Sequence, residues 1–492
     1  MAPGSQIVAI DCGTQSVRCL IVDVETGAHR VGASEPIILA RSGIDAIEVD
    51  PLHLVQATVR VLRATLALCR QTPISLAITN MRETAIAWSR ETGQPVHDGI
   101  MWMSQQSQTI VQRWDRDGLS PLIRERTGLS NHTFFFGSKI AWLLDANPDL
   151  ERQAQAGKIA VGTVDAWLLY VLSGGRTHAT DVSNASRYQL LNLRTLQWDP
   201  DLSDALRIPI AALPLVKPTS ADFGFTDARF TGVRIPITGM IGDQQASLLG
   251  HDCVQIGDAK ATFGTSCVVG VNLGRRPAEA AGLVTSVAWA DNETEAVYEM
   301  EGSAFHSGFT MTWLTRVLSL PSAAQDQVTR SAMPPNRRVT VVPSFTEMGA
   351  PTWLKGNGAS ISGLTMDTAP ADILRAGIES MAYQAFELVS AAPLVTNQDR
   401  ALSVDGGAAN NDYLCQTMAD LTGRVVMRPP SCELTGFGAA RAAAATLGID
   451  IPTVATTADR SRISDRFIPS EDTAYAAEGF AHWQETVRKH LR

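Results

Sequence analysis

Residues 7–23 read IVAIDCGTQSVRCLIVD. An apolar run over residues 7–10 stops at Asp11 and a Gly-Thr turn, and a second apolar run follows over residues 19–22. This pattern predicts a tight hairpin whose two arms are buried and whose tip is polar. The hairpin raises the question of what an acid, a glycine and hydroxyl groups do at its tip.

A similar stretch, AKATFGTSCVVGVN, occupies residues 259–272. It again sets a glycine and small hydroxyls on a turn before an apolar strand. One such turn is common, but two of them, each beside an apolar strand and half the chain apart, favour two similar domains that face each other. We expect a first domain over residues 1–246 and a second over residues 247–492.

Length, charge and the distribution of apolar residues limit the classes of protein that this chain can belong to. A chain of 492 residues exceeds one ordinary core, which favours two or more domains. The net charge is −9 and the Lys and Arg residues are scattered, which argues against nucleic acid or an anionic membrane surface as a partner. We find no apolar run of membrane length and no signal peptide, so we expect a cytoplasmic protein.

The seven cysteines are odd in number and form no CxxC pair, and the nine histidines show no HxxxH or HExxH spacing. We therefore expect reduced thiols and no metal site made only of protein ligands.

Short apolar strands alternate with longer helical patterns along the chain. The predicted strands are residues 75–80, 158–162, 267–272, 338–344 and 402–407. Helical spacing is found over residues 51–68 and 370–389, with Pro370 and Asp372 marking a helix start. The alternation predicts an α/β chain with a helix-covered sheet in each domain.

The two Gly-Thr turns have the chemistry of phosphate sites. A glycine leaves room for close approach, and outward-facing N–H groups and hydroxyls hold phosphate oxygens. The first turn offers Gly13 with Thr14, Gln15 and Ser16, with the Arg18 cation nearby, and the second offers Gly264 with Thr265 and Ser266. Asp11 either caps its turn or holds Mg²⁺ through water. Ordinary hairpin tips are the alternative interpretation.

Two further segments carry candidate chemistry. In LSVDGGAANNDYLCQTMADLTG, residues 402–423, a strand and two glycines precede a helix that begins near Asn411, which suits a ribose or phosphate as well as a plain turn. In ITGMIGDQQASLLG, residues 237–250, Asp243 follows a glycine turn at the expected domain boundary. Asp243 is a candidate general base, a helix N-cap, or both.

Eight stretches together carry a family resemblance. They are IDCGTQSVR (10–18), ITNMRETAIAW (78–88), GIMWM (99–103), GTVDAWLLYVLSGGRTHATDVSNASR (162–187), IPITGMIGDQQASLLG (235–250), FGTSC (263–267), VPSFTEMGAPTW (342–353) and VDGGAANNDYLCQ (404–416). In this order they resemble the FGGY carbohydrate kinases, and among them most closely those that act on glycerol.

The resemblance implies two actin-like, hexokinase-like (ribonuclease H-like) domains that close over ATP and substrate in a central cleft. The first would bind the polyol and the second the nucleotide. Residues expected at the phosphates and Mg²⁺ are Asp11, Thr14, Gln15, Ser16 and Arg18 on one side and Thr265 on the other. Residues expected around the adenosine are Gly308, Gly407 and Asn411, with Thr312 where related kinases have a glutamine.

For the substrate, the resemblance implies a polyol held by Arg82, Glu83, Trp102, Asp243 and Gln244. Arg82 and Glu83 are neighbours, so both reach one ligand only if the strand before them has ended. Asp243 would accept the proton of a terminal hydroxyl during in-line transfer of the γ-phosphoryl group. Two positions depart from the pattern: Phe134 replaces a tyrosine and Val268 a phenylalanine, which predicts a roomier and less polar end of the pocket.

The predicted activity is ATP-dependent phosphorylation of glycerol to glycerol 3-phosphate, with Mg²⁺. A four-carbon polyol or ketose (erythritol, threitol or erythrulose) is the alternative substrate. A non-catalytic actin-like nucleotide-binding protein is the alternative of another class. The family also implies a homodimer or homotetramer.

Overall fold

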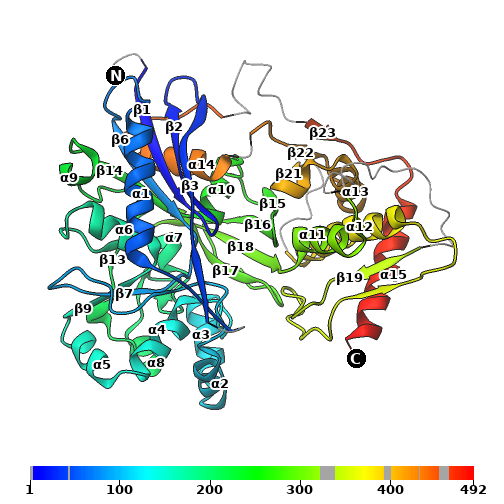
Figure 1. The fold of residues 1–492 in the computed structure, drawn as a ribbon, viewed down its shortest axis with the longest axis horizontal. Helices are drawn as coiled ribbons and strands as arrows, with labels where there is room; N and C mark the ends of the chain where they lie inside the picture. Colours follow the sequence, from blue (N-terminus) through cyan, green and yellow to red (C-terminus); the bar gives the residue numbers. More distant parts are fainter. Residues whose placement is uncertain are drawn as a thin grey trace.

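The computed structural model describes residues 4–42, 45–321, 338–392, 400–431, 433–453 and 465–491. Two large sheets organise the chain, each flanked by helices (Figure 1). The first sheet has the strand order β14-β6-β1-β2-β3, and the second has the order β17-β18-β16-β15-β21-β22-β23.

The opening hairpin has the predicted form. Strands β1 (Gln6–Cys12) and β2 (Ser16–Asp23) pair antiparallel, with Asp11 opposite Arg18. The Gly13 amide donates to the Ser16 carbonyl at 3.0 Å and closes the turn. Residues of β1 alternate between two buried faces, with Val8 and Ile10 in one core and Ile7 and Ala9 in another. Both faces of the sheet are therefore covered, which explains the continuous apolar run.

The two sheets repeat one arrangement. In the first, hairpin β1–β2 continues to β3 (His29–Pro36) on one side and to the parallel strands β6 (Ser75–Asn80) and β14 (Ile237–Gly242) on the other. In the second, hairpin β15 (Ala259–Phe263) and β16 (Cys267–Gly274) continues to β18 (Ala296–Ala304) and to the parallel strands β21 (Leu402–Asp405) and β22 (Val426–Arg428). The two similar halves inferred from the Gly-Thr turns are confirmed.

One long helix of each half starts as its sequence predicts. Helix α1 (Pro51–Leu66) has Pro51 at its first position, and the Asp50 carboxylate accepts from the Leu52 amide at 2.8 Å. Helix α12 (Pro370–Ala391) begins with proline too, and the Asp372 carboxylate accepts from the Ala369 amide at 2.9 Å. Both starts use a proline whose missing N–H has no partner inside a helix anyway.

Helix α14 (Leu434–Thr446) comes from the second half of the chain but packs on the first sheet (Figure 1). Its Phe437 and Ala443 share one apolar cluster with Leu20 of β2 and Ile241 of β14. A Cβ on Gly239 would lie 2.5 Å from the Ala443 amide nitrogen, so helix and strand touch backbone to backbone. The sequence did not predict this contact, and the boundary at residues 246 and 247 stays a prediction.

Among the remaining elements, β17 and β23 form the two edges of the second sheet, and the others lie outside the two large sheets. The strands are β4 (Leu39–Ser42), β5 (Ala46–Val49), β7 (Ile86–Ser89), β8 (Gly99–Ile100), β9 (Ile159–Gly162), β10 (Ala179–Asp181), β11 (Leu191–Asn192), β12 (Gln197–Trp198), β13 (Leu215–Lys217), β17 (Val284–Ala290), β19 (Thr340–Val342), β20 (Ser360–Ser362) and β23 (Asp465–Phe467). The helices are α2 (Gln108–Arg116), α3 (Ser120–Thr127), α4 (Phe136–Asp145), α5 (Pro148–Gln155), α6 (Val164–Leu172), α7 (Val182–Ala185), α8 (Pro200–Leu206), η1 (Ile210–Ala212), α9 (Ala228–Thr231), α10 (Asp243–Gly250), α11 (Ser307–Val317), η4 (Gly407–Asn410), α13 (Asp412–Thr422) and α15 (Ala474–His490). All five predicted strands are present.

None of the helices in the described ranges is both long and apolar enough to cross a membrane. Six cysteines in these ranges carry free thiols, and Cys432 lies outside them.

Candidate active site

Three parallel strands of the first sheet deliver side chains to one edge. Cys12 of β1 and Gly242 of β14 both pair with Asn80 of β6, so the three strands end side by side. The chain segments that follow them begin with Gly13, Met81 and Asp243. Carboxyl ends of parallel strands are where α/β proteins place ligand-binding groups. This edge holds the first Gly-Thr turn, Arg82 and Asp243 together.

Asp243 is the first residue of α10, and its side chain is 25 % exposed. Its Oδ1 lies 3.2 Å from Arg82 Nε. Burial raises the pKa of Asp243 to about 6, Arg82 opposes this shift, and the carboxylates of Glu83, Asp11 and Glu301 add to it. A carboxylate with such a pKa is suited to accept a proton near neutral pH.

Arg82 and Glu83 both reach this edge because β6 has ended at Asn80, as predicted. Glu83 has a left-handed φ of 60°, which turns its side chain away from the path of a regular strand. The Arg82 guanidinium is buried and also contacts Glu301 Oε2 at 2.7 Å. Glu83 Oε1 accepts from Arg187 Nε at 2.5 Å. Glu83 is therefore held by a second arginine that the sequence analysis did not single out.

Trp102 joins the first turn to the aromatic side of the site. Its indole Nε1 donates to Thr14 Oγ1 at 2.9 Å, and its ring meets Phe134 edge to face with centroids 5.5 Å apart. Val268 pairs in register with Ser303, and Ser303 lines a cavity of about 10 Å³ together with Phe134. The structure thus brings Trp102, Thr14 and Phe134 into contact and places Val268 one strand away.

The first turn exposes the groups that phosphate recognition needs. Gln15 is exposed, Thr14 and Ser16 are half-buried, and Asp11 is buried beneath them. Arg18 Nε lies 3.0 Å from Asp11 Oδ2, and Arg18 Nη1 lies 3.1 Å from Glu433 Oε1. Burial raises the pKa of Asp11, Arg18 counteracts this, and Glu433 adds to it. Arg18 is therefore tied to Asp11 and to the start of α14.

Backbone contacts join the second turn to two further segments predicted around the adenosine. The Gly308 amide donates to the Gly264 carbonyl at 3.0 Å, and a Cβ on Gly308 would lie 2.4 Å from that oxygen. Gly406 has φ 89°, and a Cβ there would lie 2.5 Å from the Phe263 carbonyl. A Cβ on Gly407 would meet nothing within 4 Å. The start of α11 and the 406–407 turn thus flank Thr265.

Thr312 and Asn411 sit on the helices next to this turn. Thr312 Oγ1 donates to the Gly308 carbonyl at 3.4 Å, and Asn411 Oδ1 accepts from the Leu414 amide at 3.0 Å as the N-cap of α13. Asn411 follows Gly407 directly through η4. Thr312 therefore lies on α11, whose start contacts the second Gly-Thr turn. Asn411 lies at the start of α13, just after the 406–407 turn.

The donor set fits a magnesium nucleotide. Asp11 supplies one buried carboxylate beside a turn of half-exposed hydroxyls, and the described ranges contain no group of three His, Cys, Asp or Glu residues that could hold a metal ion. Mg²⁺ usually binds through one or two carboxylates, with water and phosphate oxygens completing its shell. Asp11 would hold the ion through water, and Thr14, Ser16 and Thr265 would meet phosphate oxygens.

Sequence reasoning missed a set of buried charges behind the residues predicted to hold the polyol. They are Lys260 on β15, Glu299 and Glu301 on β18, and Arg187 after α7. Burial acts to raise the pKa of both glutamates, but Arg187 and Arg82 hold the pKa of Glu301 below its usual value, while burial and Glu301 raise that of Glu299. The only sequence signal is the pair of acids in the strand pattern AVYEMEGSA.

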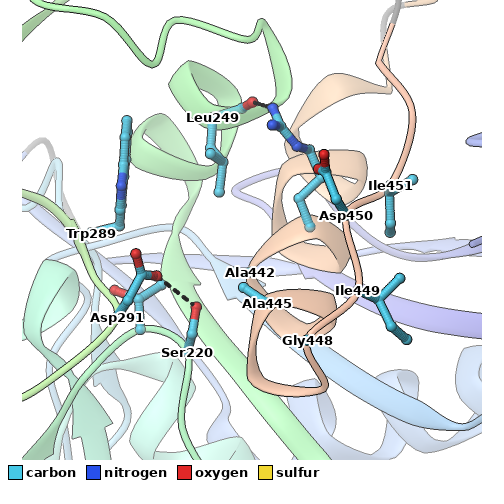
Figure 2. Close-up of a pocket in the computed structure, with 12 residues that line it drawn as sticks. Ser220, Leu249, Trp289, Asp291, Ala442, Ala445, Gly448, Ile449, Asp450 and Ile451 are labelled. Carbon is cyan, nitrogen blue, oxygen red and sulfur yellow. Dashed lines mark hydrogen bonds between the residues drawn. The ribbon is translucent and has the colours of Figure 1, made fainter. Parts of the chain in front are cut away.

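A separate cavity of about 340 Å³ lies at the other end of α10, beside Leu249 and Trp289 (Figure 2). Arg441 donates to the Leu249 carbonyl there, and Ser220 Oγ donates to Asp291 Oδ1 at 3.3 Å. Helix α10 is eight residues long, which sets this cavity on the order of 10 Å from Asp243. None of the predicted site residues lines it.

Comparison with known proteins identifies the family to which the chain belongs. The N-terminal domain of the FGGY family of carbohydrate kinases matches residues 6–250, and the C-terminal domain of that family matches residues 259–447. The chain belongs to the FGGY family of carbohydrate kinases. It is therefore a phosphotransferase with an alcohol acceptor, and its two halves have the actin-like, ribonuclease H-like fold expected from the resemblance.

Relatives of this FGGY kinase cover its full length. It is 39 % identical to a glycerol kinase of Paracidovorax citrulli, over 98 % of this chain and 99 % of the relative. It is 38 % identical to a glycerol kinase of Agrobacterium fabrum, over 99 % of each chain. The solved structure of Plasmodium falciparum glycerol kinase with ADP superposes with a TM-score of 0.89 at 28 % identity, covering 99 % of this chain and 98 % of that one.

A xylulose kinase from Lactobacillus acidophilus superposes with a TM-score of 0.85 at 19 % identity, covering 99 % of this chain and 98 % of that one. At this identity the likeness concerns the fold of the FGGY kinases alone.

Proposed function

We propose that this FGGY kinase transfers the γ-phosphoryl group of ATP to a terminal hydroxyl of glycerol and forms glycerol 3-phosphate. The observation that carries the proposal is the Asp243 carboxylate, held 3.2 Å from Arg82 with a pKa raised to about 6 by burial. The glycerol kinases that match nearly the full chain support glycerol as the acceptor.

In this proposal each residue has a separate task. Asp243 accepts the proton of the attacking hydroxyl, and Arg82 keeps that carboxylate ionised and oriented. Trp102 covers the carbon chain of the polyol, and its indole N–H holds the Thr14 hydroxyl in place. The N–H groups of the two Gly-Thr turns bind phosphate oxygens. ATP with Mg²⁺ supplies the phosphoryl group and neutralises its charge.

Phe134 is the reason for a second candidate substrate. A phenyl ring offers no hydrogen bond where the family pattern has a tyrosine, which weakens discrimination between polyols. The cavity of about 10 Å³ beside Phe134 has room for about one water and no more. Glycerol remains the proposed acceptor because the full-length relatives are glycerol kinases, and a four-carbon polyol or ketose is the alternative that the assay below separates.

A coupled ADP-release assay with MgATP tests the proposal. We would compare kcat/KM for glycerol, dihydroxyacetone, erythritol, both threitols, erythrulose and xylitol. A lead of tenfold or more for glycerol supports the proposal, and a lead for a four-carbon compound replaces it. ADP release that does not depend on any polyol would indicate an ATPase and would favour an actin-like role over a polyol kinase.

We also infer a cytoplasmic location, where ATP is available as the proposed donor. As a separate inference, we expect a homodimer or homotetramer, as in the family. Cell fractionation and light scattering after size exclusion measure these two properties.

A further inference from the structure

Lys260 is a fully buried lysine between the two halves of the candidate site. It is the second residue of β15, and it is 0 % exposed. Its Nζ donates to Gln244 Oε1 at 2.5 Å and to Thr262 Oγ1 at 2.9 Å. A lysine is almost never buried without such partners. Gln244 lies on α10 and is one of the residues predicted to hold the polyol.

The alternation of β15 explains why Lys260 meets α10. Ala259, Ala261 and Phe263 point into the apolar core of the second half. Lys260 and Thr262 must then lie on the opposite face of the strand. Gly270, its partner on the neighbouring strand, faces the same space: a Cβ there would be in ordinary van der Waals contact, 3.6 Å from Lys260 Cε and 3.7 Å from Leu248 Cδ1 of α10.

The contact with Lys260 fixes the chemistry of Gln244. A lysine ammonium has three donors and no acceptor, so the amide atom that faces it must be the oxygen. The NH₂ group of Gln244 is then the end left for a ligand. The neighbouring Asp243 carboxylate, while ionised, can only accept hydrogen bonds from a ligand. The NH₂ group of Gln244 can only donate them. The pair presents one acceptor and one donor to adjacent oxygens of a polyol.

The same ammonium is anchored to the nucleotide side. Thr262 pairs in register with Asp405, and its side chain hydrogen-bonds the Asp405 carboxylate. Asp405 directly precedes the 406–407 turn, and β15 itself leads into the turn with Gly264. Lys260 therefore joins a residue predicted to hold the polyol to the strand pair from which both nucleotide turns emerge.

Lys260 lies among other buried charged side chains. Glu299 and Glu301 share the buried region with Lys260, Arg82 and Arg187, and Lys260 acts to lower the pKa of both glutamates. Removing one cation would leave these acids with less compensation. The ammonium is thus one charge in a buried cluster of cations and carboxylates.

We propose that Lys260 is a positioning residue for the polyol: it fixes Gln244 as a hydrogen-bond donor to a substrate oxygen and ties that donor to the strand carrying the nucleotide turn. The inference rests on the proposed function, because it takes Gln244 as a residue that touches the polyol. It goes beyond that function by assigning a role to a residue of the second half.

A double-mutant cycle tests whether Lys260 acts through Gln244. We expect Lys260→Met to raise KM for glycerol about tenfold, the size of one lost charge-assisted hydrogen bond, while KM for ATP changes less than about twofold. Gln244→Leu should have a similar effect. The double variant should be no worse than Gln244→Leu, because the donor that Lys260 orients is already gone. Lys260→Gln, which retains a donor, should recover part of the affinity.

The control is Arg424→Met, which removes another buried cation of the second half, one that donates to the carbonyls of Arg400 and Ala401. It should lower the melting temperature without changing either KM. Additive effects in the cycle, or an equal rise in KM for ATP, would overturn the inference.

If Lys260→Met does not fold, Thr262→Val takes its place. This variant removes the second acceptor of the ammonium, and an unchanged KM for glycerol would then count against the role of Lys260. A wild-type protein that phosphorylates no polyol refutes the proposed function itself. A wild-type protein that prefers another polyol leaves the cycle to be run with that polyol.

Discussion

Arg82 Nε lies 3.2 Å from Asp243 Oδ1, and Nη1 of the same guanidinium lies 2.7 Å from Glu301 Oε2. One buried arginine thus connects the candidate base, at the end of the first sheet, to β18 of the second sheet. Without Arg82, the half-buried carboxylate of Asp243 and the buried carboxylates of Glu83 and Glu301 would lie close together without this cation, since the Glu83 carboxylate also lies 3.9 Å from its Nε. The arginine favours the ionised form of Asp243 although only 25 % of that side chain is exposed.

Asp243→Asn should reduce kcat by about a hundredfold or more, because the amide cannot accept the proton of the hydroxyl. ATP affinity, measured by calorimetry, should change little. Asp291→Asn is the matched control, since Asp291 lines the separate cavity and bonds Ser220. Turnover near the wild-type level in Asp243→Asn would refute the assignment of the base.

The pH profile of kcat/KM should show an acidic limb. Burial raises the pKa of Asp243 to about 6, and the group accepts a proton only when ionised, so activity should rise with pH through about 6 and then level off. The stability of the fold should change in the opposite direction. Because the folded-state pKa of Asp243 lies above its ordinary value of 3.8, the stability from this group is lost as pH rises from about 4 through about 6. A profile that is flat from pH 5 to 7 would contradict the shifted pKa.

Arg187→Met should be strongly destabilising. The guanidinium is buried between Glu83 Oε1 at 2.5 Å and Glu301 Oε1 at 3.0 Å, so its loss leaves two buried carboxylates without this partner. We expect a decrease of about 3–5 kcal/mol in the free energy of unfolding, measured with urea. Arg229→Met breaks an exposed pair with Asp227 and should cost less than about 1 kcal/mol. Equal effects of the two variants would rule out the buried pair as a stabilising contact.

Gly308→Ala and Gly407→Ala should separate packing from nucleotide binding. A Cβ on Gly308 would lie 2.4 Å from the Gly264 carbonyl and would displace the second turn, so both the melting temperature and ATP affinity should fall. A Cβ on Gly407 would meet nothing within 4 Å. Gly407→Ala should therefore leave the melting temperature unchanged and lower only the affinity for ATP. Unchanged ATP affinity in Gly407→Ala would remove this glycine from the nucleotide site.

Phe134→Tyr should sharpen the choice of substrate. The added hydroxyl would enter the small cavity that Phe134 shares with Ser303 and Glu301, and it should improve kcat/KM for glycerol several-fold relative to erythritol. Phe225→Tyr, on an exposed ring outside the site, is the control. The same change for both polyols would show that Phe134 does not discriminate between them.

The parts of the fold that were predicted from sequence are those with local signals. The hairpin at residues 7–23 is marked by apolar arms around a Gly-Thr tip, and α1 and α12 are marked by an initial proline with a capping acid. Asp243 could be singled out because it follows a glycine at the end of a strand. Its partner Arg82 was identified only through the family resemblance, since nothing local indicates that the two residues meet.

The parts that were missed depend on distant partners. Glu299 and Glu301 alternate with apolar residues in β18, a pattern typical of a half-exposed strand. Both are nevertheless buried, because Arg82, which follows β6, pairs with both and Arg187, which follows α7, pairs with Glu301. The role of Lys260 was hidden for the same reason. Helix α14 is rich in alanine and glycine, which gives little amphipathic signal, and its partner surface is defined by close backbone approach at Gly239.

The position of α14 also determines when the first sheet can complete its packing during synthesis of the chain. Leu20, Ala77 and Ile241 lie in the apolar cluster that α14 completes. These three residues leave the ribosome long before residue 434 does, because translation runs from the N-terminus. The first sheet therefore remains uncovered on one face until most of the chain has been made, and its final packing is a late event for the nascent protein.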